Sequence, residues 1–200
     1  MIAYKFLDEG TVSPFTRIRW TPGVWMKAAQ SREGFGIHAC RPLDLAWWIA
    51  PELWRLELSD PVRERYTQIE AASGKLIEPI AGWTARTREE FGIHCVMRTR
   101  DVAEEALRKL GHIELADRLA RAGTLELLRE ATAVPLPPGL AGEMIGYAQS
   151  ACAAFLRTGN SAESSFIVSI ASAGARGDPS GFGEERTRQS RWLAQLLGLA

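Results

Sequence analysis

The sequence predicts an α+β fold, in which an N-terminal antiparallel sheet half precedes a C-terminal helical half. Short strand-like segments closed by turn residues dominate up to residue 83, and helical periodicity dominates from residue 84 onward. Strands and helices that are segregated along a chain favour α+β over α/β. We therefore divide the chain into residues 1–83 and 84–200 and expect one compact unit.

The first half is expected to contain short strands and one short helix. Residues 3–7 are an apolar-aromatic run closed by a turn signal, and residues 53–58 alternate between apolar and charged side chains, as a half-buried strand does. Helical spacing of apolar residues predicts a helix over 42–50, which Pro51 closes. The other expected strands are 18–20, 24–26, 35–39, and a hairpin of 62–71 and 75–80 that turns at Ser73-Gly74.

The second half is expected to consist of helices. Thr87 and Glu90 match a capping box, which predicts a helix start there, and an apolar stripe continues to Gly111. Residues 134–139 are rich in proline and predict a break, because proline lacks the N–H that a helix needs. Residues 174–183 are expected to form a mobile loop. The other expected helices are 113–122, 125–131, one around 144–155, 163–173 and 184–197.

Composition excludes several classes of protein. The 24 basic and 24 acidic residues give zero net charge, which argues against general binding to nucleic acid or to anionic membranes. From the pattern of its first residues we expect no secretion signal, and because no apolar run approaches 18 residues we expect no membrane-spanning helix. Three widely spaced cysteines do not indicate a disulfide framework. We expect a cytoplasmic protein.

Two stretches of the chain nearly repeat each other, and each contains a Phe-Gly-Ile-His sequence. Together they hold His38, Cys40, His94 and Cys95, a set of ligands suited to zinc. However, the first stretch is predicted to be a strand and the second the start of a helix, where adjacent side chains diverge by about 100°. We therefore interpret the cysteines as buried small hydrophobes and predict no metal site.

Tryptophan is concentrated near the N-terminus, which suggests a binding pocket. Five of the seven tryptophans fall in the first 54 residues, and they could either fill a small core or form the wall of an aromatic pocket. Trp47 and Trp48 cannot both face inward on one helix, so one of them is the better functional candidate. The predicted ligand-binding residues are Trp20, His38, Cys40, Arg41, Trp47 and Trp54.

Most of the chain resembles a group of proteins from actinobacteria and their phages that have no assigned activity. The resemblance names a family but implies no reaction. Its most distinctive motif is Gly-x-His-Ala-Cys, and it rests on Tyr4-Lys-Phe-Leu7, Ser13-Pro-Phe15, Gly23-x-Trp25, Gly36-Ile-His38-Ala-Cys40, Pro51-Glu-Leu-Trp54-Arg-Leu-Glu57-Leu58 and the C-terminal segment 185–199.

A second resemblance is to the ADP-ribosyltransferase fold. The order of a glycine-aromatic strand at 34–38, a helix with Trp47 and a strand at 53–58 is similar to that fold. The resemblance implies a cleft for NAD, with Glu57 or Glu78 as the carboxylate that supports an oxocarbenium-like transition state.

Two functions follow as expectations. The first is a non-catalytic protein that binds a small molecule or a protein partner through its aromatic N-terminal half. The alternative is an NAD-using enzyme of ADP-ribosyltransferase type. Under the first expectation no cofactor is specified.

Overall fold

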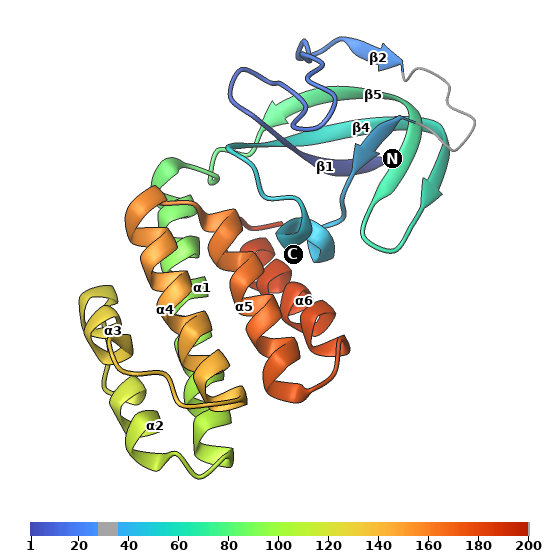
Figure 1. Cartoon of the computed structure of the whole chain (residues 1–200). Coiled ribbons are helices and arrows are strands. Elements are labelled where there is room, and N and C mark those ends of the chain that lie inside the picture. The colour runs from blue at the N-terminus through green and yellow to red at the C-terminus, as the bar shows by residue number, and fades with distance from the viewer. Residues whose placement is uncertain (28–35, 200) are drawn as a thin grey trace. The chain divides into compact units, whose positions relative to one another are not determined.

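The computed structural model describes residues 1–27 and 36–199, and it has the predicted α+β organisation. The chain packs as two compact units (Figure 1). The N-terminal unit comprises Met1–Ala85 together with Ser190–Ala200, and the helical unit comprises Arg86–Gln189.

The N-terminal unit contains an antiparallel sheet. β1 pairs with β4, β4 pairs with β5, and β5 carries both β2 and β3 on its other edge. The strands are β1 (Ile2–Leu7), β2 (Trp25–Lys27), β3 (Ile37–Ala39), β4 (Glu52–Glu64) and β5 (Ile69–Pro79).

The sheet curls until its ends meet. Tyr4 on β1 and Cys40, just after β3, exchange two backbone hydrogen bonds of 3.0 and 2.8 Å, so the ladder returns from β3 to β1. Apolar side chains on the inner face form the core of this unit. The core comprises Ala3, Leu7, Trp20, Ile37, Ala39, Leu56, Leu58, Ile69, Ala71 and Leu76.

The expected hairpin turn at Ser73-Gly74 is wrong. β5 runs straight through these residues, and the chain turns at 65–68 instead, where Glu64 pairs with Ile69. A Cβ atom at Gly74 would lie 3.1 Å from Ile37 and 3.3 Å from side chains on β4, so glycine here permits close packing within a strand.

Other expected elements of this unit differ in extent. Residues 18–20 form no strand; Val12 and Arg19 make only an isolated bridge. The expected helix 42–50 is a 3-10 helix over Pro42–Trp47. The expected strand 35–39 is confirmed from Ile37 on, and its first residue lies outside the described ranges.

Six helices follow. α1 begins at Ala85, before the expected start, so Thr87 lies inside its first turn. The second Phe-Gly-Ile-His stretch lies within α1, whereas His38 of the first lies on β3, so the prediction of two different contexts is confirmed. The helices are α1 (Ala85–Lys109), α2 (Ile113–Ala120), α3 (Leu125–Thr132), α4 (Leu140–Thr158), α5 (Ser161–Arg176) and α6 (Ser180–Leu196).

The expected loop at 174–183 is wrong. α5 continues to Arg176, and α6 begins at Ser180. Gly177 ends α5 in a left-handed conformation, with φ of 66°. Asp178 then accepts a 2.9 Å hydrogen bond from the Ser180 amide, which satisfies one free N–H at the start of α6. Gly177 and Asp178 therefore specify a tight turn between α5 and α6 rather than a long loop.

The helical unit has its own apolar core. It is formed mainly by α1 and α4, and the shorter α2 and α3 add leucine and alanine side chains to it. α4 packs against both α3 and α5 (Figure 1). Over the described ranges, no helix is long and apolar enough to cross a membrane.

Candidate functional site

The N-terminal unit contains a cavity of about 420 Å³ with aromatic walls. Its lining comes from β1, the loop that joins β1 to β2, β2, β3 with one residue on either side of it, and Trp48 just after the 3-10 helix. This volume is in the range of protein sites for small organic molecules. The aromatic residues that line it are Tyr4, Phe6, Phe15, Trp20 and Trp48.

The loop before β2 is held firmly in place beside the cavity. The backbone of Thr11 has φ of 59°, a left-handed conformation that is costly for a residue with a side chain. Its hydroxyl donates a 2.6 Å hydrogen bond to the Trp20 carbonyl, and its amide donates one of 3.3 Å to Glu52. Trp20 itself is 3% exposed and donates from Nε1 to Ser13 at 2.9 Å. These bonds fix the aromatic wall.

The outer rim of the cavity is also aromatic. The Trp48 indole donates a 2.7 Å hydrogen bond to the Thr67 carbonyl, which orients its ring. Phe15 is 84% exposed and meets the edge of Trp48 with ring centroids 6.5 Å apart. Phe15 and Trp48 together form the aromatic rim of the cavity.

Lys5 is the distinctive polar group of the cavity. It occupies β1 between Ala3 and Leu7, which are almost fully buried, and the two-residue period of a strand places all three on one face. Its Nζ donates a 2.6 Å hydrogen bond to the His38 carbonyl and lies 5.2 Å from the centroid of Trp20. The sheet therefore directs an ammonium group toward its apolar side.

No carboxylate of the described residues balances the charge of Lys5. Among the described residues, no ion pair involves Lys5, and the side chains that line the cavity include Lys27 but neither aspartate nor glutamate. Burial lowers the pKa of Lys5 to about 8. Burial also raises the pKa of the Cys40 thiol, so Cys40 stays a neutral thiol.

Three of the predicted ligand-binding residues line the cavity, namely Trp20, His38 and Cys40. The remaining three do not belong to the described lining. Arg41 forms ion pairs with Asp44 at 2.5 Å and Glu64 at 3.0 Å, Trp47 meets the ring of Tyr66, and Trp54 donates to Glu52. Of the Trp47-Trp48 pair, Trp48 is the one that faces the cavity.

The two predicted catalytic glutamates lie on the sheet, outside the described lining of the cavity. Glu57 pairs with Lys75 at 2.7 Å, and Glu78 pairs with Arg55 at 2.8 Å, in both cases across β4 and β5. Cross-strand ion pairs of this kind support a sheet surface. A catalytic role for either glutamate stays a prediction.

Sequence reasoning missed Lys5, although a signal was present. A charged residue between two apolar positions of an alternating strand, as in Ala3-x-Lys5-x-Leu7, places a charge on the core face. Phe15 was missed as a site residue because it lies in a loop, where the sequence has no regular period from which the orientation of a side chain can be predicted.

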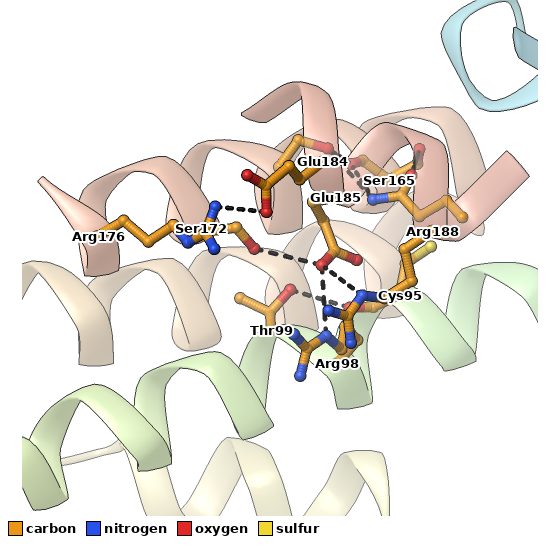
Figure 2. Close-up of polar contacts among 11 residues, drawn as sticks. Cys95, Arg98, Thr99, Ser165, Ser172, Arg176, Glu184, Glu185 and Arg188 are labelled. Atoms are coloured by element: carbon orange, nitrogen blue, oxygen red, sulfur yellow. Dashed lines mark hydrogen bonds and ion pairs between the residues drawn. The ribbon is translucent and has the colours of Figure 1, made fainter. Parts of the chain in front are cut away.

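A second polar cluster lies in the helical unit, around Glu185 of α6 (Figure 2). Glu185 is 3% exposed, and its Oε2 accepts hydrogen bonds from Arg98 at 3.4 Å and Ser172 at 3.5 Å. Arg188 forms an ion pair with the same oxygen at 3.6 Å. The cluster thus links α1, α5 and α6, while Oε1 of Glu185 is buried with no hydrogen-bond partner in the part of the chain that the structure describes.

Charges of both signs surround this cluster. Arg176 and Glu184 form a further ion pair of 2.5 Å (Figure 2). Both residues line a depression of about 260 Å³. Thr99, next to it on α1, donates to the Cys95 carbonyl at 2.9 Å. Because these side chains mainly satisfy one another, we interpret the cluster as an interhelical network that fixes how α6 packs.

The described residues contain no group of three or more His, Cys, Asp or Glu side chains placed to hold a metal ion. Comparison of the chain with family models, curated proteins and solved structures finds no match. The two resemblances noted in the sequence therefore stay predictions. The functional argument rests on the aromatic cavity and on Lys5, which pairs with no carboxylate of the described residues.

Proposed function

We propose that this protein binds a small amphipathic anion, with an aromatic or otherwise apolar body and one carboxylate-like group, in the cavity of its N-terminal unit. The observation that carries the proposal is that the described cavity lining combines aromatic walls with two lysines and no carboxylate. An apolar body would cover Trp20 and Trp48, and the anionic group would meet Nζ of Lys5.

Lys5 supports this assignment through its electrostatics. The Lys5 ammonium pairs with no carboxylate of the described residues and lies 5.2 Å from the Trp20 ring centroid, where burial weakens its solvation, so a ligand anion would restore the interaction that burial removes. A hydrogen bond to a charged group contributes about 1.5–3 kcal/mol, which corresponds to about 10–100-fold in affinity. The bound anion would also displace water from the apolar walls.

Calorimetric titration with a matched pair of probes tests the proposal. We expect 2-naphthylacetate to bind at least ~10-fold more tightly than 2-naphthylacetamide near pH 7, because only the acid can pair with Lys5. Lys5→Met is expected to remove this difference. Lys75→Met is the matched control, since Lys75 lies on the same sheet but pairs with Glu57 outside the described lining.

Equal affinity for the acid and the amide would contradict the proposal, as would an unchanged preference for the acid in Lys5→Met. The pH dependence gives a second check. Since the pKa of Lys5 is lowered to about 8, binding of the acid is expected to weaken as the pH rises above that value, whereas binding of the neutral amide is not.

A further inference from the structure

Lys5 differs from an ordinary surface lysine in a way that bears on reactivity. Its Nζ donates one hydrogen bond to the described residues, to the His38 carbonyl, which uses a single N–H, and the Lys5 side chain lines the cavity. The Trp20 ring on one side contributes no proton acceptor. The nitrogen is therefore positioned to meet a ligand atom rather than another side chain.

The surroundings of Lys5 also favour its neutral form. Lysines that act as nucleophiles are commonly desolvated in apolar pockets, which increases the fraction of free amine near neutral pH. With a pKa of about 8, roughly half of Lys5 is a free amine at that pH. For a lysine with the usual pKa the free amine is only about 1 in 250 at the same pH.

We propose that Lys5 forms a reversible imine with small aromatic aldehydes that enter the cavity. This inference rests on the proposed function in one respect, namely that the cavity admits a small apolar body. It adds a ligand class, carbonyl compounds, and a covalent site on this chain.

The step is balanced without an oxidant or reductant. The Nζ lone pair attacks the carbonyl carbon, a proton passes from nitrogen to the former carbonyl oxygen, and the resulting carbinolamine loses water to give the imine. The net change is one amine and one aldehyde converted into one imine and one water. Apolar walls favour this outcome, because they limit access of the water that would hydrolyse the imine.

Reductive trapping on the full chain tests the proposal. The protein is incubated with 2-naphthaldehyde near pH 8, borohydride is added to convert the imine into a stable secondary amine, and labelled positions are mapped by mass spectrometry. Lys5 is expected to be labelled at least ~10-fold faster than Lys109, which is exposed and paired with Glu105. Peptide fragmentation must separate Lys5 from the Met1 amino group, since both lie in one short peptide.

Two comparisons make the result specific. An excess of 2-naphthylacetate is expected to slow labelling of Lys5 but not of Lys109, because only Lys5 lies in the cavity. Lys5→Gln is expected to lose the label, and Lys27→Gln to keep it at Lys5. Labelling of Lys5 no faster than of Lys109, or preferential labelling of Lys27, would overturn the inference. Failure of trapping while calorimetry still shows preferential binding of the acid would overturn the imine alone and leave the proposed function standing.

Discussion

Replacing Lys5 with methionine is expected to raise the free energy of unfolding by about 1–3 kcal/mol near pH 7. Methionine is unbranched like lysine and only one atom shorter, and it removes the desolvated charge. The shift of the Lys5 pKa from 10.5 to about 8 sets the size of the effect. The expected gain is discounted because methionine loses the hydrogen bond to His38, and because water reaches part of the cavity.

The sign of the pH dependence follows from proton binding. Between about pH 8 and 10.5 the unfolded chain holds a proton on Lys5 that the folded protein has lost, so the stability of the wild type rises with pH in this interval. The variant has no such group. Its advantage over the wild type is therefore expected to be largest below pH 8 and to shrink toward pH 10.5.

Urea unfolding of both proteins at several pH values measures this difference. Lys75→Met serves as the control, because it removes a lysine that is paired with Glu57 at 2.7 Å, and it is expected to give no gain in stability. A variant that is less stable than the wild type at neutral pH, or a difference that does not change with pH, would contradict the account of Lys5.

Alanine at Gly142 of α4 is expected to lower the free energy of unfolding by about 3 kcal/mol. A Cβ atom there would lie 2.0 Å from the carbonyl oxygen of Pro137, which is backbone and cannot move aside as a flexible side chain can. Relief of the clash requires the segment before α4 to shift. In that segment, the Cβ atom of Leu136 would also lie 3.5 Å from the added Cβ.

Gly146, one turn further along α4, provides the matched control. A Cβ atom at Gly146 would meet nothing within 4 Å, so Gly146→Ala is expected to stabilise the protein by about 0.5–1 kcal/mol through helix propensity alone. Thermal or urea unfolding of the two variants checks the contrast. Equal effects of the two substitutions would show that the close approach at Pro137 is not present.

Local patterns predicted the fold class and most elements, but not how strands and helices join. Ser73-Gly74 has the composition of a turn, yet it lies within β5 because Ile37 and Leu56 pack against the glycine. Residues 174–183 have the composition of a loop, yet Gly177 and Asp178 make a tight turn between α5 and α6. In each case the deciding contacts come from packing or capping that composition alone does not reveal.

The candidate site was only partly predictable for the same reason. Trp20, His38 and Cys40 were selected from residue type and local context, and they do line the cavity. Lys5 and Phe15 became site residues only once the curled sheet and the β1–β2 loop were in place. Trp47 and Trp48 are adjacent, and the sequence could not say which of the two faces the cavity.

The most direct test of the central claim is whether a bound anion lies against the tryptophans of the cavity. Protein labelled with 5-fluorotryptophan can be titrated with 2-naphthylacetate and followed by ¹⁹F NMR, with resonances assigned by single tryptophan-to-phenylalanine substitutions. The account predicts that the Trp20 and Trp48 resonances shift as the acid binds, while those of Trp54 and Trp83, outside the described lining, stay in place. Binding of the acid with no change at Trp20 and Trp48 would contradict it.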